Sequence, residues 1–470
     1  MSISMQTTRD LNAKLPLKVK FGYGTSGFCS FITWTVFSYY GLYFMNEVVG
    51  LSAAFAGALI SLGTLWDAIT DPIVGSISDN LKNPKGRRRP LIKMIAFPFI
   101  IISVLLFTNL GLGETATKIY FFVVIILYYL AQTVLDISSS SLGSEMTNNY
   151  DERASLATWK NYFGLLPTVA ISACLILVDF WSTKFSNPDL GWTATVACYM
   201  IPTLILLVIL YKSTDGYERP RSDSDEVVKY SVKNVINLFK NKGTRVVMLI
   251  FGISIFANTI NYSVQVYYYT DYMGMSSEQV ALATFVFGVA SVFCAYLVEK
   301  LMIKLDKKMS WVVAIGLEAL VLIVDVGFII KAGSSSMTTL LVTMLLMGLG
   351  NAAVYQVPWA MIPDCVDVDQ LADPNGRRND GIVFGAVAFV QKACGAVGAL
   401  VLGILIDMAA GDPNAYKYIF AFLVGGIYLL TCFIVKAYPI NKKRHDDVIE
   451  AIEARAAGQT INMADFKDLI

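Results

Sequence analysis

The amino-acid sequence predicts an all-α membrane protein with twelve transmembrane helices and both termini on the cytoplasmic side. Three observations lead to this prediction. Hydrophobic residues make up 55% of the 470 residues and charged residues only 16%, whereas roughly 25% of the residues of a soluble protein are charged. Apolar runs long enough to span a bilayer as helices recur along the whole chain. Lysine and arginine are concentrated in every second connection between these runs.

The apolar runs number twelve, and each is close to the roughly 20 residues that a transmembrane helix needs. They cover residues 22–45, 52–78, 91–111, 119–145, 161–181, 192–211, 246–270, 279–298, 310–330, 338–362, 382–408 and 416–437. Because each run can cross the hydrocarbon core, we expect a bundle of twelve helices.

The basic residues predict the orientation of this bundle, because short loops rich in Lys and Arg remain in the cytoplasm. With the N-terminus inside, the cytoplasmic segments hold 32 of the 37 basic residues. Four lie on the opposite side, and the last, Lys392, lies inside the eleventh run. The first 20 residues are polar, without the basic-then-apolar order of a cleaved signal. We therefore expect a multi-pass protein of the bacterial cytoplasmic membrane.

The longest polar stretch, 213–245, divides the runs into two sets of six. The predicted organisation is an N-terminal half (1–212), this linker, a C-terminal half (246–437) and a charged tail (438–470), for which a peripheral helix without a readable function is expected. The linker contains apolar residues at amphipathic helical spacing, which favours a helix on the inner membrane surface, and a solvated linker is an equal alternative. The amphipathic positions are Val228, Val232, Val235, Ile236 and Phe239.

The two halves resemble each other weakly. SLGSEMTNNYDERAS follows the fourth run and WAMIPDCVDVDQLADPNGRRND ends the tenth, so that Glu145 corresponds to Asp364 and Arg153 to Arg377 or Arg378. Two six-helix repeats around a site near the bilayer midplane are typical of the major facilitator fold.

Composition and motifs exclude several classes of function. A net charge of +1 argues against nucleic-acid binding. The seven cysteines are dispersed, so neither a disulfide framework nor a zinc site is expected. The single histidine, His445, lies in the tail. Phosphate-loop, metalloprotease and nucleophile-elbow motifs are absent, so we expect no enzyme activity and no internal use of ATP. A carbonyl filter sequence is also absent, which disfavours a passive channel.

Four charged residues lie within the predicted spans. Asp67 and Asp71 are one helical turn apart, and Asp136 and Lys392 lie at a similar depth, roughly 10 to 16 Å from the cytoplasmic edge. Charged groups at such depths are costly and tend to mark a transport pathway. A tie between Asp136 and Lys392 would be purely structural, but one lysine cannot neutralise three carboxylates. We therefore expect a mobile cation at Asp67 and Asp71, either Na⁺ or H⁺.

Neighbouring residues fit a cation site beside a polar substrate. The hydroxyl oxygens of Thr70 and Thr133 can complete a shell for a hard cation. The aromatic residues Tyr355 and Trp359 are candidates for stacking on sugar rings, although most aromatic residues in such a chain pack or lie at interfaces. Other aromatic candidates are Trp34, Tyr39, Tyr40 and Tyr43, and the sequence offers no account of Glu318 and Asp325 in the ninth run.

A second charged motif follows the second run. Asp79 stands near the end of that run, and Gly86 precedes three arginines, Arg87, Arg88 and Arg89. An aspartate facing an arginine cluster can lock helix ends in one conformational state, so we expect a cytoplasmic gate here. The alternative is that the arginines serve topology alone.

These motifs resemble the glycoside-pentoside-hexuronide:cation symporter family, to which the melibiose carrier belongs. The similarity extends from about residue 20 to 450 and rests on WDAITDPIVGSISD, GRRRP, YDERASL, QKACG and YPINKKRHDDV. It implies a major facilitator fold and sugar symport with Na⁺, H⁺ or Li⁺. Asp67, Thr70, Asp71 and Thr133 fall on the family's cation positions, and Asp136 and Lys392 fall on positions that hold sugar or link the two sites.

The chain also departs from the family carrier. Its first run has no carboxylate, Ser140 replaces a tryptophan, and the arginine expected near the start of the fifth span is represented at most by Lys160 or Asn161. The predicted substrate residues are thus Asp136, Ser140, Tyr355, Trp359 and Lys392, and a β-glucoside, xyloside or hexuronide is as acceptable as a galactoside. We expect a monomeric sugar symporter without cofactor or nucleic-acid partner, and a carrier of lipids or drugs is the alternative.

Overall fold

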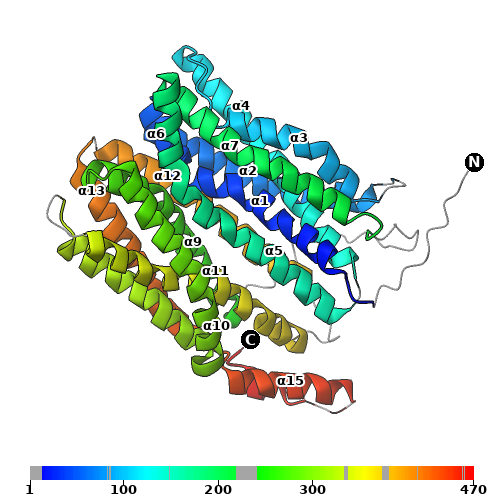
Figure 1. Ribbon diagram of the computed structural model, residues 1–470. Helices are drawn as coiled ribbons and strands as arrows, with labels where there is room; N and C mark the ends of the chain where they lie inside the picture. Colours follow the sequence, from blue (N-terminus) through cyan, green and yellow to red (C-terminus); the bar gives the residue numbers. More distant parts are fainter. Residues whose placement is uncertain are drawn as a thin grey trace, which may run out of the picture. The chain divides into compact units, whose positions relative to one another are not determined.

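The computed structural model describes residues 13–81, 83, 86–147, 149–218, 241–332, 337–372, 380–409, 411–457, 459 and 461–469 (Figure 1). Every regular element in these ranges is helical. Most of the predicted linker helix and both Arg377 and Arg378 lie outside the described residues.

Contacts divide the chain into two compact units. We name them the N-terminal unit, Met1–Phe37 with Trp66–Glu226, and the C-terminal unit, Ser38–Leu65 with Val227–Ile470. The division crosses the first two helices of the chain, α1 and α2.

The first part of the chain forms seven α-helices before the linker. They are α1 (Leu17–Tyr43), α2 (Ala53–Asn80), α3 (Arg89–Leu105), α4 (Glu114–Glu145), α5 (Tyr150–Ala170), α6 (Cys174–Phe185) and α7 (Pro188–Ser213), with the short segments η1 (Phe44–Val48) and η2 (Ile171–Ala173). Within the N-terminal unit, α3 packs against α4 and α7, and α6 packs against α7.

The C-terminal unit contains the remaining helices. They are α9 (Lys242–Tyr267), α10 (Ser277–Val321), α11 (Met337–Ala372), α12 (Asp380–Ala409), α13 (Pro413–Tyr418), α14 (Gly425–Ile434) and α15 (Lys442–Ala456), with η3 (Tyr268–Tyr272), η4 (Leu322–Ile329), η5 (Ile419–Val424), η6 (Val435–Ala437) and η7 (Met463–Phe466). The main packing pairs are α10 with α11 and α9 with α12, and α15, in the predicted tail, packs on α11.

An all-α membrane protein is confirmed. Within the described residues, nine helical segments are long and apolar enough to cross a bilayer. The eighth and ninth predicted runs both fall in the continuous helical segment of α10 and η4, and between them Asp306 of α10 has a non-helical backbone with φ 71° and ψ 159°. The Asp306 carboxylate accepts a hydrogen bond of 2.6 Å from the N–H of Lys307, which stabilises this break. The number of twelve spans and the positions of the termini stay predictions.

Close helix contacts depend on glycine at two positions that matter for the charged residues. A Cβ atom on Gly27 of α1 would lie 2.0 Å from the carbonyl oxygen of Lys160 on α5. A Cβ atom on Gly350 of α11 would lie 2.1 Å from a carboxyl oxygen of Glu318 on α10. Only a residue without a side chain allows these approaches, so glycine holds α1 beside Lys160 and α11 beside Glu318.

Candidate functional site

Asp67 and Asp71 lie on the packed side of α2. Thr70, Val74 and Ser78 are buried, with exposed fractions of 3%, 6% and 0%. Asp67 lies one turn before Thr70 and Asp71 directly follows it, and both aspartates are half-buried. The neighbouring stripe, formed by Ile69, Ile73 and Ile77, is half exposed. A helix with an apolar outer stripe and carboxylates on its packed face suits a transmembrane segment whose charges face the protein.

Three of the four predicted cation residues lie together in the N-terminal unit. The hydroxyl of Thr133 on α4 donates a hydrogen bond to the carboxylate of Asp67 on α2. The hydroxyl oxygens of Thr133 and Thr70 are 3.4 Å apart, and the Thr70 hydroxyl also reaches the carbonyl oxygen of Asp67 at 3.2 Å. We call Asp67, Thr70 and Thr133 the oxygen cluster. The fourth residue, Asp71, follows Thr70 on α2.

The oxygen cluster offers the ligand type that hard cations prefer, namely carboxylate and hydroxyl oxygens. Thr133 is buried, with 2% of its surface exposed, and its hydroxyl is also held by the carbonyl oxygen of Tyr129 at 2.9 Å. The site is therefore preorganised by the backbone of α4 as well as by the side chain of Asp67. Such a site can hold a monovalent cation next to Asp67, or a proton on its carboxylate.

Asp136 has a partner that the sequence reasoning did not propose. The ammonium group of Lys160 on α5 lies 3.1 Å from the Asp136 carboxylate and 2.6 Å from the hydroxyl of Ser140. Lys160 had been counted among the cytoplasmic loop charges, but it lies in the helical segment Ser155–Phe185, which is apolar enough to span. Two predicted substrate residues, Asp136 and Ser140, are thus joined by a second embedded lysine.

The other predicted substrate residues belong to the C-terminal unit. The hydroxyl of Tyr355 on α11 accepts a hydrogen bond of 3.1 Å from the amide of Asn258 on α9. Trp359, one turn further, packs its ring against Phe251 and Phe384, with ring centroids 5.7 Å and 6.0 Å away. Lys392 lies half-buried on α12. The place of Lys392 in the substrate site stays a prediction.

The arginines of the predicted gate bind the ends of neighbouring helices in the N-terminal unit. Arg88 pairs with Asp79 at the end of α2 and bonds Ser78. The carboxylate of Glu145 at the end of α4 receives both Arg87, at 3.0 Å, and Arg88, at 3.1 Å. We call this group the N-terminal clamp. It joins α2, the start of α3 and α4.

A second carboxylate explains the glycine before the arginines. Glu218, beyond α7, accepts hydrogen bonds from the backbone N–H groups of all three arginines at the start of α3. These N–H groups have no partner inside the helix, and the helix dipole favours an anion there. Gly86 has φ 103°, and a Cβ atom on it would lie 2.0 Å from the Glu218 carboxylate. The positive φ favours glycine here, and the absence of a Cβ atom leaves room for the Glu218 carboxylate.

Arg89 completes the attachment of α7. Its guanidinium lies 2.5 Å from the carboxylate of Asp215 and donates a hydrogen bond of 2.9 Å to the carbonyl oxygen of Tyr211. It also lies over the Tyr211 ring, 4.4 Å from the centroid. The three arginines therefore do more than set the membrane topology, because they connect four helix ends within one unit.

The C-terminal unit has an ion pair at Asp364, the residue that the weak sequence repeat set against Glu145. Lys307 on α10 lies 2.7 Å from the carboxylate of Asp364 on α11, and the Tyr438 hydroxyl is 3.4 Å from the same carboxylate. His445 on α15 reaches Asp367 at 3.0 Å. Burial raises the pKa of Tyr438, so this hydroxyl stays a donor. We call this group the C-terminal clamp.

Sequence reasoning missed the roles of Glu145, Glu218, Asp215 and Lys160. Glu145 was noted only as a repeat position, although its place at a helix end near GRRR was a usable signal. Glu218 and Asp215 lie at the start of the predicted linker. Hydrophobic periodicity there does not distinguish a carboxylate that caps a helix from one that is solvated. Lys160 lies close to the edge of an apolar run, and hydropathy alone does not show whether such a residue belongs to the loop or to the span.

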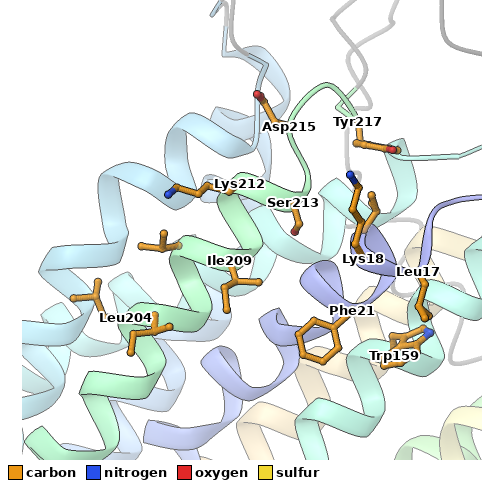
Figure 2. A pocket seen from close by; sticks show the side chains of 13 residues that line it. Leu17, Lys18, Phe21, Trp159, Leu204, Ile209, Lys212, Ser213, Asp215 and Tyr217 are labelled. Carbon is orange, nitrogen blue, oxygen red and sulfur yellow. The ribbon is translucent and has the colours of Figure 1, made fainter.

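An open groove of about 1110 Å³ also lies in the N-terminal unit, between α1, α5 and α7 (Figure 2). Phe21, Trp159, Leu204 and Ile209 are among its largely apolar lining residues, and Lys212 stands at one end with other polar side chains. None of the predicted cation or substrate residues lines this groove.

Apolar outer stripes, embedded carboxylates on packed faces and ion-paired helix ends define the chain as a multi-pass membrane protein of the transporter class. The sequence model of the MFS/sugar transport protein family matches residues 21–444. The chain therefore belongs to this family of the major facilitator superfamily, as the motifs predicted.

Individual relatives are distant but similar over almost their whole length. The chain is 26% identical over 468 residues to the uncharacterized symporter YnaJ of Bacillus subtilis (strain 168), which covers 97% of this chain and 98% of that protein. It is 25% identical over 396 residues to the putative glycoside/cation symporter YagG of Escherichia coli (strain K12), covering 84% and 83%. The crystal structure of a D-xylose-proton symporter has a TM-score of 0.61 and 14% identity, covering 91% of this chain and 98% of that one. That likeness indicates a shared fold.

Proposed function

We propose that the protein is a secondary active symporter that couples the movement of a sugar or glycoside to that of a cation, Na⁺ or H⁺, with Li⁺ as a substitute. The oxygen cluster carries this proposal, because it joins a carboxylate and two hydroxyl groups on the packed faces of α2 and α4. The relatives support the substrate class, since one is named a putative glycoside/cation symporter. A structural neighbour is named a D-xylose-proton symporter.

Charge balance gives the physical reason for a coupling ion. Among the candidate residues of the N-terminal unit, Asp67, Asp71 and Asp136 supply three negative groups and Lys160 one positive group. Lys392 in the C-terminal unit supplies one more positive group. Three carboxylates and two ammonium groups leave one negative charge, which one monovalent cation at Asp67 and Asp71 offsets.

The proposed transport mechanism rests on the two predicted six-helix halves. Twelve spans with cytoplasmic termini would form two halves that rock around a midplane site. Cation binding would raise the affinity for sugar, and linkage requires sugar to raise the affinity for the cation equally. Asp136, Ser140, Tyr355, Trp359 and Lys392 would contact the sugar. The clamps would hold the cytoplasmic helix ends in one state and release them in the other.

Uptake into proteoliposomes tests this function. A panel of glycosides is offered under imposed Na⁺, Li⁺ or proton gradients, and Asp71→Cys is compared with Asp179→Asn, a carboxylate change on the exposed surface of α6. We expect Asp71→Cys to abolish accumulation against a gradient and Asp179→Asn to accumulate as the unmodified protein does. Accumulation that persists in Asp71→Cys contradicts the cation assignment. Transport of lipids or drugs with no glycoside transported contradicts the substrate class.

A further inference from the structure

Glu318 of α10 is a carboxyl group in the interior of the C-terminal unit. None of its surface is exposed. Both of its carboxyl oxygens are buried without a hydrogen-bond partner among the residues that the structure describes. The salt bridges found within these ranges do not include it. The oxygen cluster and the clamps do not use this residue, so its role is separate from theirs.

Among the described residues, no neighbour of Glu318 forms a hydrogen bond or an ion pair with its carboxyl group. Gly350 brings the backbone of α11 against the carboxyl group. The ionisable groups near enough to interact electrostatically with it are Tyr428 on α14 and Tyr39 on α1, and neither donates a hydrogen bond to it. Both tyrosines are buried, with exposed fractions of 0% and 4%. A carboxylate that loses its hydration without gaining a cation or donors is strongly disfavoured, and binding a proton removes the charge.

We infer that Glu318 is a proton-binding site inside the C-terminal unit, occupied by a proton in this conformation and distinct from the oxygen cluster of the N-terminal unit. The ligand is H⁺, and the group that holds it is the side-chain carboxyl. The position within a candidate span makes this site a place where a proton can be loaded and released when hydration changes.

A chain of polar side chains connects this site with a predicted substrate residue. Tyr428, which interacts electrostatically with Glu318, places its hydroxyl 3.4 Å from the side-chain oxygen of Asn258. The amide nitrogen of Asn258 donates to the hydroxyl of Tyr355 at 3.1 Å. A change in charge at Glu318 would therefore act on Tyr355 by an electrostatic effect on Tyr428 and then through two hydrogen bonds. This link, unlike proton binding itself, rests on the proposed function.

A parallel network surrounds the same region. The hydroxyl of Tyr262 donates to Asn351 at 2.6 Å, and Asn351 donates to Ser291 at 3.0 Å. The ring of Tyr262 stacks on Tyr39 with centroids 4.7 Å apart. These groups satisfy one another, which leaves Glu318 as the carboxyl group in this network without a donor.

Infrared difference spectroscopy of the full-length protein in lipid nanodiscs tests the proton site. A protonated carboxyl group has a C=O stretching band that a carboxylate lacks. We expect the unmodified protein to show such a band at neutral pH, Glu318→Gln to lose the intensity of one carboxyl group, and Asp325→Asn to keep it. Asp325 is a matched control, because it lies seven residues away and accepts a hydrogen bond of 3.2 Å from Thr343. A spectrum that Glu318→Gln leaves unchanged overturns the proposal.

A second variant covers the case in which Glu318→Gln does not fold. Tyr428→Phe removes only a hydroxyl that interacts electrostatically with Glu318, and we expect it to shift the frequency of the same C=O band. A protein without any protonated-carboxyl band, or a band that Tyr428→Phe does not shift, contradicts the site. Glycoside uptake is measured on the same preparations. Failure of all uptake refutes the proposed function, whereas the infrared result decides the state of Glu318 independently.

Discussion

Asp67 and Glu318 are both carboxyl groups within predicted spans, but their surroundings differ in kind. Asp67 is half-buried, accepts a hydrogen bond from Thr133 and lies beside the hydroxyl of Thr70. Glu318 is fully buried, and neither oxygen has a donor among the described residues. Donors and additional oxygens favour the ionised form and can share a cation, whereas burial without donors favours the neutral acid. One chain thus offers two different sites for positive charge.

The difference teaches that a membrane-embedded carboxyl group has no single function. The hydroxyl neighbours of Asp67 come from residues one turn apart and from the next packed helix. The contact that buries Glu318 comes from a glycine on α11. Which neighbour stands beside the acid therefore decides whether a metal cation or a proton is the better ligand.

The largest expected effect is on cation binding at Asp67. Asp67→Asn keeps the size of the side chain but removes the charge, so the affinity for the coupling cation should fall on the order of 100-fold, as when one partner of a buried charge pair is removed. Cation-dependent quenching of tryptophan fluorescence in the purified protein measures this change. Asp179→Asn serves as the control. An unchanged affinity in Asp67→Asn would remove Asp67 from the cation site.

A smaller effect is expected at Thr133, whose hydroxyl contributes hydrogen bonds without a charge. Thr133→Ala should weaken cation affinity by about tenfold, the equivalent of roughly one hydrogen bond to a charged group. Thr133→Ser keeps the hydroxyl and should remain within about twofold of the unmodified protein by the same titration. Equal losses in the two variants would show that packing by the methyl group, and not the hydroxyl, matters.

The N-terminal clamp should contribute to stability. Glu145 receives two arginines and is largely buried, so Glu145→Gln should lower the unfolding free energy by about 1 to 3 kcal/mol. Asp79 is 62% exposed in its pair with Arg88, so Asp79→Asn should cost less than about 1 kcal/mol. Thermal unfolding in detergent compares the two. A larger loss for Asp79→Asn than for Glu145→Gln contradicts this ranking.

The smallest expected effect is a pH dependence at Glu152, near the start of α5. Hydrogen bonds from Lys20, at 2.8 Å, and from the N–H of Leu15, at 2.9 Å, lower the pKa of its carboxyl group. Since the folded-state pKa lies below the unfolded value, this stabilisation is complete above the unfolded pKa and is lost as pH falls through the folded pKa.

The difference in melting temperature between the unmodified protein and Glu152→Gln should therefore shrink on acidification and be largest near neutral pH. Melting curves recorded between neutral and acidic pH measure it. A difference that grows as the pH falls would reverse the sign of this argument.

Helical periodicity was sufficient to predict that Asp67 and Asp71 lie on one face of α2, because residues three or four positions apart on a helix share a side in any fold. The weak sequence repeat also set Glu145 against Asp364, and each of these carboxylates forms an ion pair within its own unit. Hydropathy was sufficient for the all-α class, since backbone groups in a bilayer must pair within the segment, whereas the number of twelve spans stays a prediction.

Contacts between segments that are far apart in the sequence could not be predicted from hydropathy or helical periodicity. Lys160 was assigned to a loop because a lysine near the edge of an apolar run has the same hydropathy whether it reaches Asp136 or water. Glu318 was visible in the sequence, but its isolation depends on Gly350, on a different helix. Glu218 bonds the backbone N–H groups at the start of α3. A contact with the backbone leaves no pattern in the side chains of the sequence.

Accumulation of a transported glycoside in proteoliposomes containing the double variant Asp67→Asn with Asp71→Asn tests the central claim most directly. Na⁺, Li⁺ and proton gradients are imposed in turn, and exchange of labelled for unlabelled glycoside without a gradient shows that the protein is folded. The account predicts that exchange continues and accumulation stops under every gradient. Accumulation that continues under any of the three gradients would contradict it.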